Sequence, residues 1–452
     1  MRDTIAAIST GGQVSAIGIV RVSGEKSIAL ADRLFIPSAG GGMGTQPDRK
    51  LVYGELRGRE GNLLDLCMCT VSRGPNSYTG EDTAEFQCHG SPMLLETLLQ
   101  ELFRLGARQA LPGEFTKRAF LNGKMDLSSA EAVIDLIDAE STEAVRNAAG
   151  QLSGAVHRKA EEIYTALGDI SAHFHAVLDY PDEDLEAFRI RDYEASMRQG
   201  LKTLQVLLQS FERGKTLNTG LRTAIIGLPN AGKSSLLNAL VGFDRAIVTE
   251  VPGTTRDTVE ERVKVGGVLL RLIDTAGLRE TEDRVERLGV ERSLEAAAGA
   301  DLVLAVLDGS RELERGAEQV LATADRAKRG IVLLSKADLP RKVTAVPTSL
   351  PVLSVSSLSG EGFDDLEDLI AELFPLPSVP AGEILTNARQ ADAVRRAAES
   401  MEAALRCLEE GRTPDIVLTE TETAMQALGE LTGRSIRDDI TDRIFARFCV
   451  GK

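Results

Sequence analysis

The chain has 452 residues, of which 43% are hydrophobic and 27% are charged, as in ordinary globular proteins. At ~150 residues per domain, this length predicts about three domains. No apolar run approaches the ~20 residues that span a bilayer, and the N-terminus lacks a secretory signal, so we expect a cytoplasmic protein with no membrane segment. The formal net charge of −16 disfavours strong direct RNA binding unless a basic patch or a partner supplies the attraction.

The cysteines are few and odd in number, and none are spaced as Cys-x-x-Cys. This usage disfavours a disulfide framework and a structural zinc site. Cys67 and Cys69 alternate along a predicted strand, so we interpret them as two small residues on one face. Cys449 lies three residues before the last residue and is kept as a candidate for a role in the chemistry.

Residues 1–120 mix strand and helix patterns and predict an α+β domain. Gly40-Gly41-Gly42 predicts a surface loop in it. The expected strands cover 16–22, 63–72 and 83–88, and the expected helices cover 26–34 and 93–105.

Helical periodicity then takes over, with apolar residues recurring at helical spacing from 128 to about 213. Strand and turn signals return near 223 and persist to about 374, where three prolines mark a boundary. Helical spacing resumes afterwards and ends in the series Ile436, Ile440, Ile444 and Phe448. We therefore predict one discontinuous all-α domain, 121–216 and 379–452, interrupted by an inserted α/β domain, 217–378.

The strongest motif lies at the start of the insertion. Gly227-Leu228-Pro229-Asn230-Ala231-Gly232-Lys233-Ser234 follows an apolar strand and precedes a helix-compatible run that begins at Ser235, which is the order of a P-loop. Its backbone N–H groups would cradle phosphates, Lys233 would reach the β and γ phosphates, and the Ser234 hydroxyl would ligate Mg²⁺. The predicted domain is a Ras-like P-loop GTPase.

Two further segments fit the regions that sense the γ-phosphate. Thr255 could complete the Mg²⁺ shell, Asp274 would hold the metal through water, and the Gly277 amide could contact the γ-phosphate. The nucleotide-binding residues expected in these segments are Thr249, Glu250, Val251, Pro252, Gly253, Thr254 and Thr255, then Asp274, Thr275, Ala276 and Gly277.

The base-reading segment is Ser335-Lys336-Ala337-Asp338, at the end of an apolar strand. Asp338 could accept hydrogen bonds from both guanine N1–H and N2–H₂, which selects guanine over adenine. The usual motif begins with Asn, and Ser335 can form only part of its bridging hydrogen bonds, so we expect guanine selectivity with weakened nucleotide affinity. Ser356-Ser357-Leu358 would pack near the base.

Hydrolysis also needs a group that orients water. Leu278 follows Gly277 and cannot do this, so the local alternatives are Glu280, Glu282, Asp283 and Glu286, although most of them fit a solvated surface equally well. Asn230 either coordinates a monovalent cation in place of an arginine finger or simply fixes the loop.

Taken end to end, the sequence resembles the MnmE (TrmE) family of tRNA-modification GTPases. The resemblance is carried by the inserted GTPase domain and by these segments: Asp3-Thr4-Ile5-Ala6-Ala7, Gly18 to Gly24, Tyr78-Thr79-Gly80-Glu81-Asp82, Pro112-Gly113-Glu114-Phe115, Arg118 to Lys124, Gly253-Thr254-Thr255-Arg256-Asp257 and Phe448-Cys449-Val450-Gly451-Lys452.

The resemblance implies a homodimer formed through the N-terminal domain, which works with an FAD-containing partner, MnmG, in a heterotetramer. Together they would install a carboxymethylaminomethyl group on the wobble uridine of certain tRNAs. A 5-formyl- or methylene-tetrahydrofolate would supply the one-carbon unit. The family's folate site corresponds here to Arg21, Glu85, Lys124 and Lys452, whereas the residues alone place Arg21 and Lys124 among ordinary surface charges.

The resemblance also implies K⁺-dependent dimerisation of the GTPase domains. The ion would be bound by Asn230, Thr249, Val251 and Thr254, and Glu286 would orient the catalytic water indirectly. Catalysis would then rest on Glu286, Lys233 and Thr255, and Cys449 would lie near the modification site. The sequence departs from the family at Gly11-Gly12-Gln13-Val14, where a Pro-Pro-Gly-Arg stretch is usual.

Two other functions compete with this one. A nucleotide-controlled assembly switch would hydrolyse GTP slowly and without K⁺ stimulation. A folate-dependent transferase with a vestigial GTPase domain is disfavoured, because Lys233, Ser234, Thr255, Asp274 and Asp338 are all present.

Overall fold

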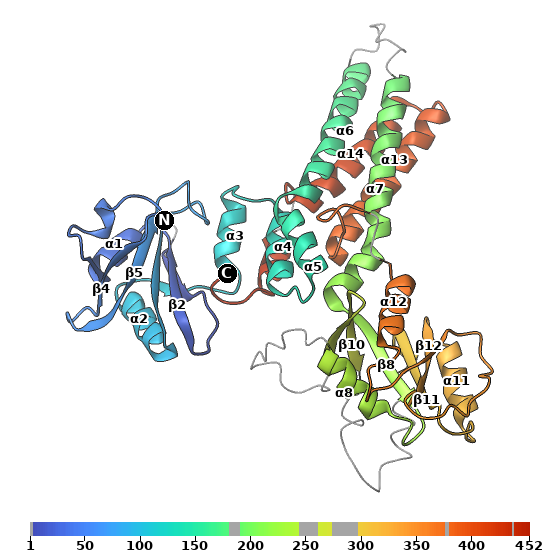
Figure 1. Cartoon of the computed structure of the whole chain (residues 1–452). Helices are drawn as coiled ribbons and strands as arrows, with labels where there is room; N and C mark the ends of the chain where they lie inside the picture. Colours follow the sequence, from blue (N-terminus) through green and yellow to red (C-terminus); the bar gives the residue numbers. More distant parts are fainter. Residues whose placement is uncertain (1–2, 180–189, 244–260, 274–296, 376–378, 436–437) are drawn as a thin grey trace. The chain divides into compact units, whose positions relative to one another are not determined.

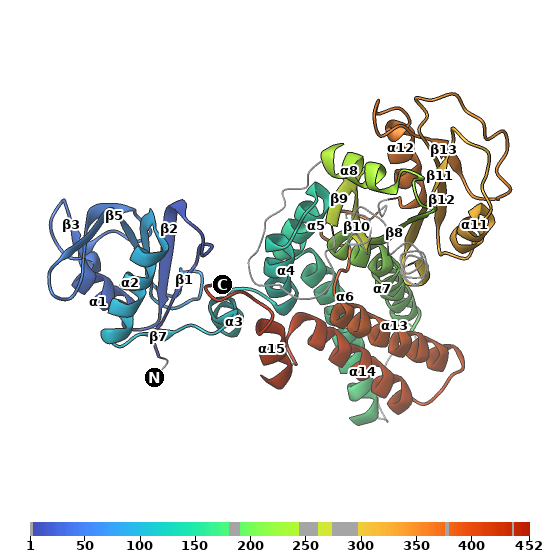
Figure 2. The ribbon, with the colours of Figure 1, turned by 90° about the horizontal axis from the view of Figure 1, so that it is seen from below.

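The computed structural model describes residues 3–179, 190–243, 261–273, 297–375, 379–435 and 438–452. The chain divides into two compact units, each assembled from segments distant in sequence. The first combines residues 1–134, 152–193 and 403–452, and the second combines 135–151 and 194–402. Figures 1 and 2 label their helices and strands. No helix of the described ranges is both long enough and apolar enough to cross a membrane.

The N-terminal part of the first unit is built on a seven-stranded sheet with the order β3-β4-β5-β6-β2-β1-β7. All neighbours are antiparallel except β1 and β7. The strands are β1 Ile5–Ile8, β2 Ser15–Ser23, β3 Phe35–Pro37, β4 Val52–Arg57, β5 Leu63–Ser72, β6 Thr83–Gly90 and β7 Arg108–Gln109.

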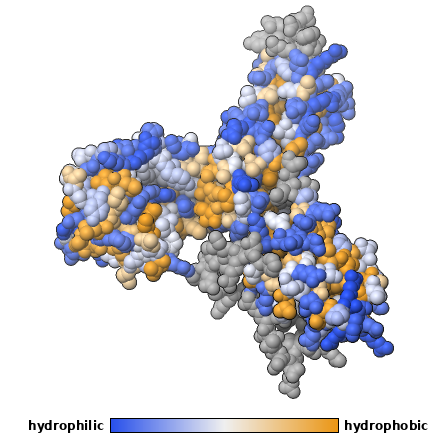
Figure 3. Space-filling view, in the orientation of Figure 1, coloured by the Kyte–Doolittle hydropathy of each residue, from blue (hydrophilic) through white to orange (hydrophobic). Residues whose placement is uncertain are grey.

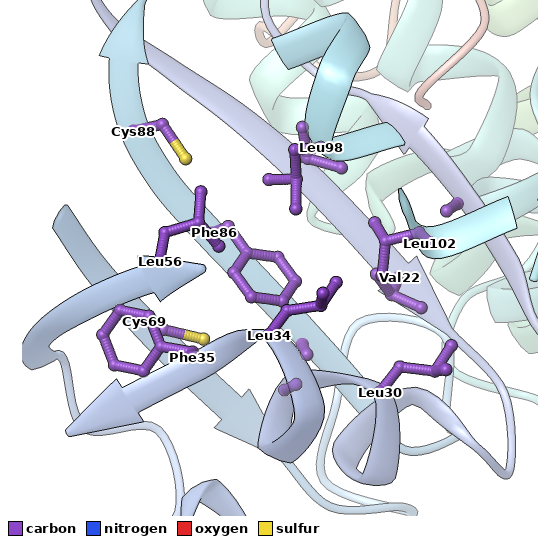
Figure 4. Packing of buried hydrophobic residues seen from close by; sticks show 14 of the residues in the cluster. Val22, Leu30, Leu34, Phe35, Leu56, Cys69, Phe86, Cys88, Leu98 and Leu102 are labelled. Atoms are coloured by element: carbon purple, nitrogen blue, oxygen red, sulfur yellow. The ribbon is translucent and has the colours of Figure 1, made fainter. Parts of the chain in front are cut away.

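Two helices, α1 Ser27–Leu34 and α2 Pro92–Arg104, cover one face of this sheet. Their leucines pack with the inward residues of the strands, as Figure 4 shows for Leu34, Leu98 and Phe86. Cys67 and Cys69 belong to this core, which confirms that they share one face. The triple glycine lies in exposed turns before a short 3₁₀ helix, Met43–Thr45.

Helices complete the first unit. They are α3 Glu114–Leu121, the start of α4 Leu127–Ile137, α6 Ala155–Asp179, α14 Pro414–Thr432 and α15 Asp438–Phe445. α6 and α14 pack along one another. The helical spacing expected to reach Phe448 is wrong at its end, because α15 stops at Phe445 and Phe448 instead packs beside Phe445 and Leu127.

The C-terminal residues of the chain are bound to its N-terminal domain. The Phe115 amide donates to the Lys452 carbonyl at 3.1 Å, and the Gly113 amide donates to the Cys449 carbonyl at 3.3 Å. The Ser9 hydroxyl donates to the Gly451 carbonyl at 3.0 Å. Residues 449–452 are therefore packed against the N-terminal domain, close to the end of its first strand.

The second unit contains the inserted domain, a six-stranded sheet with the order β13-β12-β11-β8-β10-β9. Only β9 is antiparallel to its neighbour. α8 and α12 cover one face and α11 covers the other, so the domain is a three-layer α/β fold. The elements are β8 Leu221–Gly227, α8 Lys233–Phe243, β9 Glu261–Val265, β10 Val268–Ile273, β11 Leu302–Asp308, α11 Ala317–Asp325, β12 Gly330–Ser335, β13 Val352–Ser354 and α12 Phe363–Leu373.

The root of the insertion is held by hydrogen bonds between helices and the returning chain. α5 Thr142–Leu152 and α7 Ile190–Thr219 precede the insertion, and α13 Ala388–Glu409 follows it. The buried Asn147 amide donates to the Ile384 carbonyl at 3.0 Å. The Leu385 amide donates to the Ser210 hydroxyl at 3.0 Å. A Cβ at Gly214 would lie 1.9 Å from the Leu385 carbonyl oxygen, so glycine lets the two segments cross. The structure confirms the multidomain class, with α+β, helical and inserted α/β parts.

Candidate functional site

The parallel strands of the inserted domain all end at one edge of the sheet. The first of them, β8, lies between β10 and β11. The strands that follow β8 directly in the chain therefore lie on one side of it, and the later strands lie on its other side. In open α/β sheets, ligands bind at such a topological switch point, beyond the carboxyl ends of the strands. The P-loop follows β8, and the base-reading segment follows β12 at the same edge.

The P-loop leads from β8 directly into α8, which begins at Lys233. Asn230 and Gly232 have positive φ angles of 58° and 96°, a backbone conformation in which successive amides can form an anion-binding concavity. The Lys233 ammonium donates to the carbonyls of Gly227 and Leu228 at 2.9 and 2.8 Å. The lysine therefore already lies over the loop, close to where the predicted phosphates would bind.

The other polar residues of the loop face outward. Asn230, Ser234 and Ser235 are exposed, and Ala231 is buried beneath them. Asn230 also lines a small hollow with Asp308 and Arg311. The loop thus presents two hydroxyls and one amide to any phosphate or cation that binds there.

Ser335 links the base-reading segment to the P-loop. Its buried hydroxyl lies 2.6 Å from the Ala231 carbonyl and 3.2 Å from the Leu307 carbonyl, and donates to them. A Cβ at Gly232 would lie 3.3 Å from the Ser335 side chain, so glycine keeps the loop close to β12. The serine thus links β12 to the P-loop through its single hydroxyl, and the expected weakening of nucleotide affinity stays a prediction.

Asp338 is held in place by Ser356, whose buried hydroxyl donates to the carboxylate at 2.6 Å. The Ala337 amide donates to the Val355 carbonyl at 3.1 Å, which fixes the loop after β12 to the loop after β13. Lys336 forms an ion pair with Asp308 at 2.6 Å. Ser357 is partly exposed, and Leu358 is 87% exposed.

Twelve of the expected nucleotide, metal and catalytic residues lie outside the described residues, so their predictions stay predictions. They are Thr249, Glu250, Val251, Pro252, Gly253, Thr254, Thr255, Asp274, Thr275, Ala276, Gly277 and Glu286.

A second cluster lies on the open face of the N-terminal sheet. Arg21 on β2 forms an ion pair with Glu85 on β6 at 2.7 Å, and the two residues are cross-strand partners. The guanidinium carbon lies 5.3 Å from the Tyr78 ring centre and 5.6 Å from the Phe115 ring centre, which is cation–π distance. The interpretation of Arg21 as an ordinary surface charge is therefore wrong.

The other two predicted folate residues approach this cluster through its loops. The Lys124 ammonium donates to the Pro75 carbonyl at 2.9 Å, and its side chain lies along the loop that carries Tyr78, 3.4 Å from a Cβ built at Gly80. The Lys452 carbonyl accepts the amide of Phe115, whose ring faces Arg21. Lys124 is thus tied to the loop that carries Tyr78, and the backbone of Lys452 is tied to Phe115.

A buried ionic network supports these loops. Arg118, 7% exposed, donates to carboxylates of Asp3, Glu81 and Glu114 at 2.8, 2.9 and 3.0 Å. Burial alone would raise the pKa of Glu114, but hydrogen bonds from Arg108, the Leu111 amide and Arg118 outweigh it and lower that pKa. A hydrogen bond from Arg108 also lowers the pKa of Asp3.

Comparison with known proteins bears on both clusters. The model for the N-terminus of the GTP-binding protein TrmE matches residues 4–124, and the model for the MnmE helical domain matches residues 127–449. A tRNA modification GTPase MnmE from Symbiobacterium thermophilum is 42% identical over 100% of this chain and 99% of its own length. The chain belongs to the MnmE family of tRNA modification GTPases. It is therefore a GTP-binding enzyme that hydrolyses GTP in tRNA modification.

Further relatives agree. MnmE proteins of Clostridioides difficile and Geobacillus kaustophilus are 40% and 42% identical, each over 100% of this chain and 99% of their own length. Among solved structures, the G domain of the T. maritima FeoB iron transporter matches 34% of this chain and 97% of its own, with 27% identity and a TM-score of 0.25. Aquifex aeolicus Era bound to GDP·AlF₄⁻ matches 40% and 67%, with 24% identity and a TM-score of 0.26.

Sequence reasoning assigned no role to Tyr78, Phe115 or Arg118, although all three lie in segments that carry the resemblance to the MnmE family. Their partners are far away in the sequence, so no local spacing signals the contacts. A cation between two aromatic rings becomes visible only when β2, the loop after β5 and α3 are placed together.

The bridge formed by Ser335 gives a direct test of the MnmE-type nucleotide site. Ser335→Ala removes the donor to the Ala231 carbonyl, and leaving a buried acceptor unpaired costs about 1–3 kcal/mol. We expect the Kd for GTP, measured by stopped-flow fluorescence with a labelled nucleotide, to rise about tenfold. Preference for GTP over ATP should survive, because Asp338 is unchanged. An unaltered Kd would show that the bridge does not support the loop.

Proposed function

We propose that this GTPase works with an FAD-containing partner subunit to install a carboxymethylaminomethyl group on the wobble uridine of certain tRNAs. A tetrahydrofolate at the Arg21–Glu85 cluster supplies the one-carbon unit, and K⁺-dependent pairing of two GTPase domains activates hydrolysis. The observation that carries the proposal is the joining of Arg21, Glu85, Tyr78, Phe115 and the chain's last residue in one cluster.

The residues fit a folate. Glu85 is 28% exposed in its side chain, and its carboxylate can accept two hydrogen bonds from the paired donors of a pterin. Tyr78, 39% exposed, supplies aromatic surface near Arg21 and Glu85, and the buried Phe115 ring packs against Arg21. Arg21, with Lys124 and Lys452 nearby, offers positive charge to the anionic glutamate tail.

Pairing of two chains through the N-terminal sheet is supported by its open face. Ile17, Ile36, Tyr53 and Leu66 are 58%, 51%, 52% and 47% exposed. Strand registers place Ile36 opposite Glu55, and Glu55 opposite Leu66, so these side chains share the face that carries Arg21 and Glu85. Apolar side chains are visible at the surface of this domain in Figure 3. A large exposed apolar face marks an interaction surface, and a homodimer would bury it.

The nucleotide site fits Mg²⁺ and K⁺ as well as GTP. Ser234 offers a hydroxyl, which is a ligand type that Mg²⁺ accepts beside phosphate oxygens. Asn230 is exposed in the P-loop, so its carbonyl oxygen is free to face a monovalent cation. When bound, such a cation neutralises charge that develops during phosphoryl transfer. Residues of this chain hold the phosphates and position the guanine base.

The flavoprotein partner and the tRNA complete the proposal. With a net charge of −16, the chain attracts a polyanion weakly, so the partner supplies most of the attraction for tRNA. The complex works in the cytoplasm, where its tRNA substrates are found.

The cation requirement is the first test. We expect GTP hydrolysis in KCl to exceed that in NaCl at equal ionic strength by more than about tenfold, because the cation substitutes for an arginine finger. Asn230→Ala should bring the ratio close to one. Asn62→Ala, on the first unit, is the matched control and should keep the full ratio.

Equal, slow rates in both salts would instead favour a nucleotide-controlled assembly switch. If K⁺ stimulates hydrolysis equally in the unaltered protein and in Asn230→Ala, the K⁺-dependent GTPase activity is supported but the cation is not bound by Asn230.

The folate site is tested separately by calorimetry with 5-formyl-tetrahydrofolate. Glu85→Gln keeps the shape of the side chain but replaces one acceptor with a donor, so the paired donors of the pterin meet a mismatch. We expect affinity to fall about tenfold. Glu96→Gln, on the exposed surface of α2, should bind as the unaltered protein does. Equal affinity for Glu85→Gln would remove Glu85 from the site.

A further inference from the structure

The pairing of β5 with β6 ends before the two strands do. Their ladder runs from Ser72 and Thr83 to Met68 and Gln87. One residue beyond it, Cys67 and Cys88 face each other across the point where the strands separate. Both are buried, at 5% and 2% exposure, and their sulfur atoms lie 3.9 Å apart. Figure 4 shows the Cys88 side chain pointing from β6 into the core.

A carboxylate occupies the same separation point. Asp65 lies two residues before Cys67, so its side chain leaves the strand on the same side. The His89 amide donates to one carboxylate oxygen at 2.9 Å, and the His89 ring Nδ1 lies 2.8 Å from the other. The Asp65 side chain is 9% exposed and the His89 side chain is 76% exposed. His89 therefore lies at the surface and holds the carboxylate with its amide and its ring.

These three side chains have the spacing of metal ligands. One ligand atom from each of Asp65, Cys67 and Cys88 lies within 4.8 Å of the other two. Zn–S bonds of about 2.3 Å in a tetrahedral site place two sulfur atoms about 3.8 Å apart. The observed separation of 3.9 Å thus needs almost no movement. A disulfide, at about 2.05 Å, needs the sulfur atoms to approach by nearly half that separation.

We propose that Asp65, Cys67 and Cys88 bind one zinc ion at this separation point, with water as the fourth ligand. The sequence spacing disfavoured a zinc site because no Cys-x-x-Cys is present, but here each strand contributes one thiolate. His89 and the Leu66 amide hold the Asp65 carboxylate through both of its oxygens, which is the outer-shell support that metal-ligating carboxylates usually have.

The charges and protons of the site balance. Binding breaks two S–H bonds and forms two Zn–S bonds, and both protons leave to solvent. Two thiolates and one carboxylate carry three negative charges, so the occupied site has a net charge of −1. No oxidant or reductant takes part. The ion would join β5 to β6 where their backbone hydrogen bonds have ended.

Cys69 shows how an ordinary core cysteine is placed in the same strand. It is the next inward residue after Cys67, and it is fully buried. Its sulfur lies 4.0 Å from the Thr70 carbonyl, and it is not part of the three-ligand group. Cys69→Ser is therefore the matched control, because it changes a thiol of similar burial outside the proposed site.

The test uses the full-length chain with Cys407→Ser and Cys449→Ser, which removes the less buried thiols. After reduction and exhaustive dialysis against zinc, metal analysis should find one zinc per chain, and calorimetry should give one site. Asp65→Asn keeps an acceptor for the His89 amide but removes the charge, and should weaken binding at least about tenfold. Cys88→Ser should abolish the site, and Cys69→Ser should bind as the background does.

Cobalt provides a second readout, because thiolate ligation gives an intense sulfur-to-metal absorption that oxygen ligands do not give. The absorption should be present in the background chain and in Cys69→Ser, and absent in Cys88→Ser. Equal zinc uptake by the background chain, Asp65→Asn and Cys88→Ser would overturn the proposal. So would a Cys67–Cys88 disulfide in air-equilibrated protein, found as a mass loss of two hydrogens, if the reduced chain takes up no zinc.

Discussion

Lys233→Ala should reduce GTP hydrolysis by about 100- to 1000-fold, as removal of one preorganised donor to a developing charge usually does. In the structure the Lys233 ammonium is held at 2.9 and 2.8 Å by carbonyls of the P-loop itself. On nucleotide binding it can exchange these carbonyls for oxygens of the β and γ phosphates without a large movement. Single-turnover hydrolysis with excess enzyme measures the effect on chemistry separately from product release.

The control for Lys233 is another lysine of the same domain. Lys328 precedes β12, at the opposite end of the strand from Ser335, and forms an exposed ion pair with Asp301 at 2.8 Å. Lys328→Ala should hydrolyse GTP at the normal rate. If Lys233→Ala kept more than about a tenth of the single-turnover rate, the lysine would contribute far less than a P-loop lysine should.

Arg118→Met should destabilise the N-terminal domain by about 3–5 kcal/mol, the usual cost of removing one partner from a buried ion pair. The methionine fills the space of the arginine stem but leaves carboxylates of Asp3, Glu81 and Glu114 without their shared cation. Hydrogen-exchange mass spectrometry of peptides from β1 and α3 measures this, because a multidomain chain does not unfold in one transition.

Two comparisons show whether the loss comes from the buried network. Arg104→Met breaks a pair in which the arginine is 58% exposed and Glu101 keeps the hydrogen bond from the Arg59 amide, so it should cost less than about 1 kcal/mol. The pKa values of Glu114 and Asp3 are lowered in the folded protein, so their stabilising contribution is present above their unfolded pKa values and is lost as pH falls through the folded ones. Arg108 is the main cause of both lowered pKa values and stays in place, so Arg118→Met should reduce this acid dependence without removing it. The prediction would be contradicted if Arg118→Met were as protected from hydrogen exchange as Arg104→Met and its stability depended on pH as in the unaltered protein.

The sequence alone predicted those features whose residues lie next to one another in the chain. The P-loop was predictable because the strand, the glycine-containing loop and Lys233 follow one another directly, and the sheet places them where the motif requires. Residues 63–72 were predicted as a strand with the bounds that β5 shows, because alternation and flanking turns agree.

The sequence was insufficient where one residue depends on several distant ones. Arginine is a residue type that usually lies at the surface, yet the exposed fraction of Arg21 is set by Glu85, Tyr78 and Phe115, which come from three other parts of the chain. That Ser335 contacts the P-loop could not be predicted either, because its short side chain reaches the Ala231 carbonyl only where Gly232 lets the loop lie close to β12. The end of α15 was misplaced because Phe448 keeps helical spacing while it packs in a turn against Leu127.

The attachment of the C-terminal tail has a consequence for biosynthesis. Domains generally fold in order as the ribosome makes them, with the N-terminal one first. Here the Phe115 amide is paired with the carbonyl of Lys452, a residue that is translated only after the whole GTPase domain. The first domain must therefore wait, with this amide and the Ser9 hydroxyl unpaired, until residues 449–452 have been made. A nascent chain stalled before residue 449 would carry a finished nucleotide site and an unfinished first domain.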